Sequence, residues 1–195
     1  MEFMTGLGLA SAAGLNAYIP LLSMGLLDRY TNLVNLPPGW AWLQNGWVIA
    51  IVATLLLIEI VADKIPAIDS VNDTVQTLVR PTSGGIVFGS GTAAQTAAIT
   101  DPGDFARTGQ WVPVLIGVVT ALAVHLTKTA VRPAANVATA GVAAPVLSTV
   151  EDLTSVSLTF IAIVIPALVL IVLVALVWAA VWLLRRRRRP PGASR

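Results

Sequence analysis

Six apolar stretches separated by shorter polar segments dominate the chain. They cover residues 3–27, 47–62, 84–99, 111–127, 134–149 and 156–184. Because about 20 apolar residues cross a bilayer as one helix, this pattern predicts an all-α, polytopic membrane helix bundle with about six transmembrane or re-entrant helices. We expect a single transmembrane domain over residues 1–184 and an Arg-rich cytoplasmic tail over residues 185–195.

Three of these stretches depart from a simple spanning helix. The first contains Asn16 and Pro20 in mid-span. Proline removes a backbone donor and asparagine brings a polar group into hydrocarbon, so we expect a kinked or broken helix there. Residues 84–99 and 134–149 are weaker and rich in small residues, which let helix backbones approach closely. These two segments either cross fully or re-enter the membrane.

Residues 66–80 alternate apolar and polar positions at helical spacing instead of forming a continuous apolar run. Val71, Val75 and Leu78 recur every three to four residues, and Asp69 and Asp73 lie four residues apart. Such a pattern is typical of an amphipathic helix that lies in the plane of the membrane interface. We therefore expect an interfacial helix here, separate from the apolar stretch that follows.

The composition agrees with a membrane location. Hydrophobic residues make up 56% of the chain and charged residues only 11%, whereas soluble proteins carry about a quarter charged residues. Five of the twelve Lys and Arg residues form the run at residues 185–189, so the positive charge is a tail and not a nucleic-acid-binding surface. We expect membrane lipids as partners and no nucleic acid.

The distribution of basic residues predicts an orientation. With six crossings and both termini on one side, every Lys and Arg except Arg29 and Arg107 falls on that side. Cytoplasmic loops carry the excess of basic residues in membrane proteins. We therefore expect a multi-pass protein of the cell membrane with both termini in the cytoplasm.

Two short stretches resemble each other and suggest an internal repeat. Arg80-Pro81 is followed by Gly89, and Arg132-Pro133 is followed by Gly141 at the same distance. Both would run the same way through the membrane, as in transporters built from parallel repeats. If each proline opens a helix, its positive dipole end beside an arginine forms an anion site. Chance similarity in an apolar chain is the alternative.

Basic residues gather at helical spacing near the predicted cytoplasmic boundary. His125, Lys128 and Arg132 are three and four residues apart and share one helix face. Together with Lys64 and Arg80 they could hold a phosphate or carboxylate, which predicts an anionic ligand. The alternative is that they are ordinary basic residues at helix ends that extend to lipid phosphates.

Acidic residues form the second candidate group. Glu59 and Asp63 are four apart, as are Asp69 and Asp73, so each pair shares a helix face. Such pairs could bind a cation or relay protons. Glu59 is the most informative because it follows a run of apolar residues, where an ionisable group needs a partner. Alternatively, it lies near the interface and pairs with Lys64 or Arg80.

Enzyme signatures are missing from the sequence. The chain has one histidine and no cysteine, so a multi-His or Cys-based metal centre is excluded and no metal or cofactor is predicted. No nucleophile elbow or phosphate-binding loop is present. We assign no catalytic residues. The candidate ligand-binding residues are the nine charged or titratable residues of the two preceding paragraphs and Asn16. The amide of Asn16 could line the same cavity as Gln95 and Asn136.

Three motifs give the chain a family resemblance. They are Gly14-Leu15-Asn16-Ala17-Tyr18-Ile19-Pro20, then Asp63-Lys64-Ile65-Pro66 with Asp69, and Arg80-Pro81 with Gly84. With these motifs the chain resembles small bacterial membrane proteins filed as domain of unknown function 4126, over roughly residues 5–150. The resemblance implies a multi-helix protein of the bacterial inner membrane and no particular activity, with residues 13–20 and 63–85 as the centre of a site.

The favoured hypothesis is a small transporter or carrier of an anionic lipid or metabolite. Broken helices, small-residue segments and an ionisable residue at depth are features of such proteins. The first alternative is a non-transporting membrane scaffold or assembly factor, in which the polar residues only join helices. A membrane enzyme that acts on a lipid-linked substrate is the second. The small-residue faces would also suit a homo-oligomer.

Overall fold

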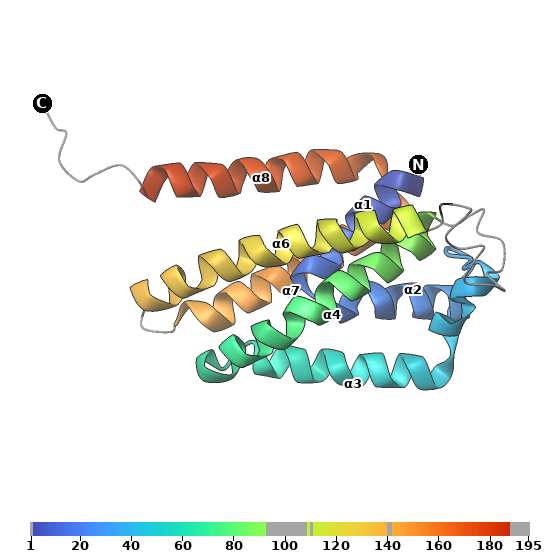
Figure 1. Cartoon of the computed structure of the whole chain (residues 1–195), viewed down its shortest axis with the longest axis horizontal. Helices are drawn as coiled ribbons and strands as arrows, with labels where there is room; N and C mark the ends of the chain where they lie inside the picture. Colours follow the sequence, from blue (N-terminus) through green and yellow to red (C-terminus); the bar gives the residue numbers. More distant parts are fainter. Residues whose placement is uncertain (1, 93–108, 110, 140–141, 188–195) are drawn as a thin grey trace, which may run out of the picture.

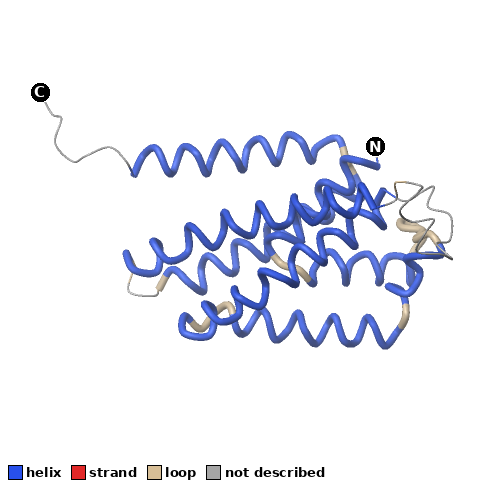
Figure 2. The backbone as a smooth tube through the Cα atoms, viewed as in Figure 1, coloured by secondary structure: helices blue, strands red, loops and turns tan. Residues whose placement is uncertain are grey.

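The computed structural model describes residues 2–92, 109, 111–139 and 142–187, and over these residues the chain is helical with no strand (Figure 2). The predicted all-α class is confirmed for this part of the chain. The elements are α1 (Glu2–Leu15), α2 (Tyr18–Tyr30), the 3-10 helix η1 (Pro38–Gln44), α3 (Gly46–Ala62), α4 (Pro66–Thr92), α6 (Trp111–Ala138), α7 (Ala143–Val164) and α8 (Ala167–Arg187).

The long helices run up and down beside one another (Figure 1). One end of the bundle, here called the η1 end, holds η1, the start of α3, the end of α4 and the turn between α7 and α8. The other, called the tail end, holds the α3–α4 turn, the α6–α7 turn and the end of α8. The start of α1 lies at the η1 end, whereas six crossings would have placed both chain termini at one end.

The first apolar stretch forms a helical hairpin of two short helices. As predicted, the helix is broken: α1 ends at Leu15 and α2 begins at Tyr18. In Figure 1, α1 runs from the η1 end to the middle of the bundle, and α2 returns to the same end. The hairpin tip at Asn16 and Ala17 therefore lies inside the bundle.

The prediction of an interfacial helix over 66–80, separate from a span over 84–99, is wrong. A single helix of 27 residues, α4, runs through Pro81 to Thr92, and residues 93–99 lie outside the described part. An internal proline removes one helical hydrogen bond, but α4 is packed against α1 and α6. Gly84 and Gly117 bring α4 and α6 so close that a Cβ on Gly84 would lie 2.7 Å from the Gly117 carbonyl oxygen.

The predicted segments over 134–149 and 156–184 also differ from the structure. Helix α6 continues through Pro133 to Ala138, α7 covers Ala143–Val164 and α8 starts at Ala167. The break falls before Pro166, because proline has no amide hydrogen and forces the preceding residue out of the helical conformation; Ile165 has φ −137° and ψ 69°. Consequently, Glu151 lies inside a helix and not in a loop.

The parallel repeat is not present. Gly84 of α4 faces Gly117 of α6, and Arg80 faces His125, so the two helices that carry the Arg-Pro motifs run in opposite directions. Neither proline opens a helix, since both lie inside one. The predicted anion site at two proline-started helix ends is therefore wrong.

Two helix segments are long and apolar enough to cross a membrane, Trp111–Pro133 and Ala143–Val164. A third is added if η1 and α3, which meet at an angle of 61°, form one bent span. These spans fit a membrane protein, although they are fewer than the six expected. Helix α4 does not qualify because its first half carries the polar pattern described above.

Candidate functional site

Charged side chains from four helices meet in the interior, toward the tail end. We call this group the ion-pair cluster. It consists of three acids and three bases: Glu59 of α3, Asp63 directly after α3, Arg80 of α4, Lys128 and Arg132 of α6, and Glu151 of α7. The side chains of the three bases are only 0–3% exposed. Buried charges require partners at close distance.

Asp63 is the centre of the cluster. Its Oδ2 atom lies 3.2 Å from Arg132 Nη2, 3.3 Å from Lys128 Nζ and 3.7 Å from Arg80 Nη2. The other oxygen, Oδ1, accepts a hydrogen bond of 2.7 Å from Asn72. Burial alone would raise the pKa of Asp63, but Lys128, Arg132, Arg80 and the Asn72 hydrogen bond together hold this pKa below its ordinary value.

Arg80 joins Glu59 to His125. Its Nη2 donates to Glu59 Oε1 at 2.8 Å, and its Nη1 lies 3.1 Å from His125 Nδ1. The Thr77 hydroxyl donates to the Asp73 carbonyl at 2.9 Å and lies 3.0 Å from His125 Nε2. Since this hydroxyl proton is already used, we assign the imidazole hydrogen to Nε2. His125 is then a neutral acceptor that holds Arg80 in place.

Glu151 completes the cluster from α7. Its Oε2 lies 2.5 Å from Arg132 Nη2 and 3.0 Å from Lys128 Nζ, while Oε1 accepts from Arg132 Nε at 3.3 Å. Two contacts to one guanidinium fix its plane as well as its position. Arg132 therefore bridges Asp63 and Glu151, and α6 is joined to α3 and α7 through it.

The hairpin tip lies on the cluster. Asn16 Oδ1 accepts from the amides of Tyr18 and Ile19 at 3.1 and 3.2 Å, which caps the start of α2. Its Nδ2 donates to Asp152 Oδ1 at 2.9 Å. The Leu15 carbonyl accepts from Lys128 Nζ at 3.2 Å. The break between α1 and α2 is thus held by side chains of α6 and α7.

Comparison with known proteins adds the family. Residues 3–186 match the sequence profile of the family described as Domain of unknown function (DUF4126). The chain belongs to this family. No curated protein and no solved structure matches the chain. The resemblance predicted from the three motifs is confirmed, and membership in DUF4126 assigns no activity.

Most of the predicted site residues come together in this DUF4126 chain. The structure brings these into the cluster or against it: Asn16, Glu59, Asp63, Lys64, Arg80, His125, Lys128 and Arg132. Lys64 lies at the margin, 38% exposed, with its Nζ 3.9 Å from Asp152 Oδ2. Of the alternatives, the pairing of Glu59 with Arg80 is confirmed. Extension to lipid is wrong for Arg80, Lys128 and Arg132.

Asp73 lies within reach of the charges of Lys128, Arg132 and Arg80 at the border of the cluster, and the Asp69 side chain is outside the described part. Asp73 lines an open recess of about 340 Å³ between α4 and α6, together with Thr74, Thr77, Leu78 and Thr129. The predicted pairing of Asp69 with Asp73 is therefore untested. Through Thr77, the recess borders the His125 side of the cluster.

Sequence reasoning missed Glu151 and Asp152. Both fall in the short segment between the predicted stretches 134–149 and 156–184, whereas they lie inside α7. One signal was available: Ser148, Asp152 and Ser155 are spaced by four and three residues, which places them on one helix face. That face meets the hairpin, since Ser155 Oγ donates to the Ala12 carbonyl at 3.0 Å.

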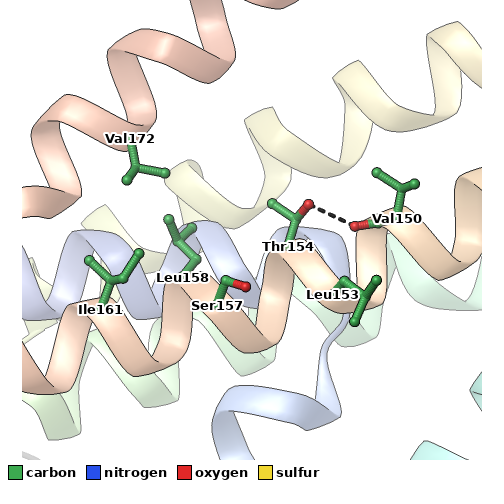
Figure 3. Close-up of a pocket in the computed structure, with 7 residues that line it drawn as sticks. All are labelled: Val150, Leu153, Thr154, Ser157, Leu158, Ile161 and Val172. Atoms are coloured by element: carbon green, nitrogen blue, oxygen red, sulfur yellow. Dashed lines mark hydrogen bonds between the residues drawn. The ribbon is translucent and has the colours of Figure 1, made fainter.

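A second groove, between α7 and α8, is mostly apolar (Figure 3). It measures about 230 Å³ and is lined by Val150, Leu153, Thr154, Ser157, Leu158, Ile161 and Val172. The Thr154 hydroxyl donates to the carbonyl of Val150 and so presents no free donor to the groove. Within the described residues, no group of three or more His, Asp or Glu side chains could hold a metal ion.

Proposed function

We propose that the protein is a small membrane carrier that binds an anionic metabolite at the ion-pair cluster, through a carboxylate or phosphate group. The observation that supports this most is the convergence of Arg80, Lys128 and Arg132 on one carboxylate oxygen, Asp63 Oδ2. Basic side chains around one anionic oxygen are how proteins bind carboxylates and phosphates. In this proposal Asp63 is a built-in anion that the ligand replaces.

The depth and burial of the cluster favour a pathway over a surface site. Glu59, His125 and Lys128 lie in helices whose other residues are mostly apolar. Ionisable residues within membrane helices are rare and mark substrate or ion pathways. A carrier needs such a buried site, which the ligand reaches from either side in turn.

The hairpin supplies the second argument for a carrier. Discontinuous helices that end near the middle of the membrane form the binding sites of many transporters, because the break exposes backbone groups. Here the break at Asn16 and Ala17 lies against Lys128 and Asp152. Because the three cluster bases are covered, a ligand reaches them only after the hairpin or a neighbouring helix moves.

We also propose an orientation that differs from the sequence-based expectation. If α3, α4, α6, α7 and α8 all cross and the α1–α2 hairpin re-enters from one side, the termini lie on opposite sides. The positive-inside rule then places the tail end in the cytoplasm and Glu2 outside. The chain has no cysteine, so single cysteines introduced at Glu2 and Thr139 can test this with a membrane-impermeant thiol reagent. Labelling of both from the same side would contradict it.

The binding test is a thermal-shift screen of the purified protein with formate, succinate, phosphate and an anionic phospholipid. A ligand at a hundred times its Kd stabilises the folded state by about 2.7 kcal/mol. We expect a soluble anion to raise the Tm of the wild type and of Arg29→Ala, but not of Arg132→Ala. Arg29 is the matched control because it lies far from the cluster and donates to the Gln44 carbonyl.

The transport test is counterflow of labelled succinate and labelled phosphate into proteoliposomes. We expect uptake by the wild type and Arg29→Ala and none by Arg132→Ala. A Tm shift with the phospholipid alone would identify a lipid headgroup as the ligand. The absence of both a Tm shift and uptake for every anion would overturn the carrier.

A membrane scaffold is the second candidate function, and one observation favours it. Each acid of the ion-pair cluster contacts at least one base, so the cluster could serve only to join helices. In that case Arg132→Ala lowers stability, no anion shifts the Tm of the wild type, and a stoichiometric partner is recovered from detergent extracts. The Tm response of the wild type therefore separates the two functions.

A further inference from the structure

The ion-pair cluster contains as many acids as bases. Its acids are Glu59, Asp63 and Glu151, and its bases are Arg80, Lys128 and Arg132. His125 is neutral by the hydrogen-bond assignment given above. With all six groups charged, the buried cluster has no net charge, which suits a medium where an isolated charge is very unfavourable.

An added anion upsets this balance. When a carboxylate ligand displaces Asp63 from the three bases, the same volume holds four negative groups and three positive ones. The excess charge is unfavourable at depth unless a proton or a cation enters with the ligand. We propose that each anion is bound together with one proton, and that Glu59 is the carboxylate that receives it. This inference rests on the proposed anion carrier and names its coupling ion.

Among the three acids of the ion-pair cluster, the oxygen atoms single out Glu59. Both oxygens of Asp63 accept hydrogen bonds, and both oxygens of Glu151 contact Arg132. Glu59 Oε1 accepts from Arg80, but the buried Oε2 atom has no hydrogen-bond partner among the described residues. A proton can therefore bind at Oε2 without displacing an existing donor, which is not true of Asp63 or Glu151.

A second buried acceptor without a partner lies on the same face of α4 as Arg80, the residue that contacts Glu59. Gln76 lies one turn before Arg80 on α4, so the two share a helix face. The side chain of Gln76 is buried, and its Oε1 is an acceptor without a partner in the described part of the chain. Ionised Glu59 adds only acceptors to this region, whereas the protonated form adds a donor.

Charged and titratable groups surround Glu59 from every helix packed around it. They are Arg80 of α4, Asp63 after α3, Lys128 of α6, Tyr18 of α2 and, through Arg80, His125 of α6. A ligand that draws Lys128 and Arg80 toward itself leaves Glu59 with less positive charge nearby. Loss of opposite charge favours the protonated carboxyl group, so anion binding and proton binding at Glu59 support each other.

The first experiment measures protons directly. Sodium formate is added to purified protein in weakly buffered detergent solution at pH 7, proton uptake is followed with an indicator dye, and formate binding is measured by calorimetry. We expect about one proton taken up per formate bound by the wild type. Glu59→Gln should bind formate with close to no proton uptake, and Asp28→Asn, a carboxylate-to-amide change at the η1 end, should behave like the wild type.

The second experiment uses proteoliposomes with labelled succinate. An inward proton gradient should drive accumulation by the wild type. Glu59→Gln should retain counterflow at equal pH but lose the response to the gradient. Proton coupling is overturned if the wild type binds formate without taking up protons, or if Glu59→Gln still accumulates succinate on a pH gradient. In both cases the anion carrier stands, whereas failure of the wild type to bind formate, succinate or phosphate removes both proposals.

Discussion

Helices α4 and α6 are joined in two different ways along one interface. Toward the η1 end the contact is made by glycines, with Gly84 and Gly117 in backbone contact and Gly85 against Val114 and Val118. Toward the tail end the same two helices are joined by Arg80 and His125, and then by Asp63 between Arg80 and Arg132. The glycine contact and the charged contact are only about one helical turn apart along α4.

The two halves of this interface differ in what they demand of their neighbours. The glycine half needs only complementary shape, because small residues let the two helix backbones approach to one defined separation. The charged half needs direction as well, because a buried ion pair that loses one member leaves an uncompensated charge. We infer that the glycine contact sets the distance at which the ion-pair cluster can form. The predictions below test this division.

Replacement of Asp63 should have the largest effect. Asp63→Ala leaves Arg80, Lys128 and Arg132 without their shared carboxylate, and breaking a buried pair typically costs about 3–5 kcal/mol. The free energy of unfolding, measured in mixed micelles with increasing SDS, should fall by an amount in this range. Asp28→Ala is the control, since Asp28 lies near the end of α2, outside the cluster, and accepts a hydrogen bond from the Leu36 amide. Equal losses of unfolding free energy in the two variants would show that the ion pairs of Asp63 do not stabilise the fold more than an ordinary carboxylate contact does.

Replacement of Gly84 should have the next largest effect. Gly84→Val introduces a side chain where a single Cβ already meets the Gly117 backbone, and overpacking typically costs about 1–3 kcal/mol. If the glycine contact sets the spacing of the cluster, anion binding should weaken as well as stability. Gly39→Val is the control, because a Cβ at Gly39 meets nothing within 4 Å. Loss of stability with unchanged anion binding would contradict the inference that the glycine contact sets the spacing of the cluster.

The sequence predicted where helices form better than it predicted which groups their polar faces contact. Asn16 and Pro20 correctly located a break in the first stretch, and the spacing of residues 66–80 correctly indicated an amphipathic helix. The polar face of that helix was assigned to the membrane interface, but Gln76 and Arg80 on it are buried in protein. Periodicity shows that a helix has a polar face and does not show whether that face meets solvent or other charges.

The missed site residues have a similar cause. Pro166 lies inside the predicted stretch 156–184, so that stretch contains no break and Glu151 and Asp152 fall between two predicted helices. With the break at Pro166, the same residues fall inside α7 and reach Arg132 and Asn16. Ion pairs between helices distant in sequence depend on which helices are neighbours, and no local pattern in this chain contains that information.

The hairpin tip should respond more weakly than either half of the α4–α6 interface. Asn16→Ala removes the cap on the first amides of α2 and the hydrogen bond to Asp152. Loss of a helix N-cap typically costs about 0.5–2 kcal/mol. We expect a loss of stability in this range, with a larger relative change in transport than in anion binding if the hairpin is the moving part. Asn45→Ala is the control, since Asn45 caps α3 with a hydrogen bond to the Trp47 amide at the η1 end.

Acid titration should give the smallest effect near neutral pH and should act on the charged half alone. The folded-state pKa of Asp63 lies below its ordinary value, so its ion pairs contribute their full stability above the unfolded-state pKa of about 3.9. That contribution is lost as the pH falls through the lower, folded-state value. The unfolding free energy of Gly39→Val, which changes neither half of the interface, should therefore keep the acid-induced decline of the wild type, whereas Asp63→Asn should show a shallower one below pH 4. A decline of equal slope in Asp63→Asn would mean that another carboxylate governs the acid response.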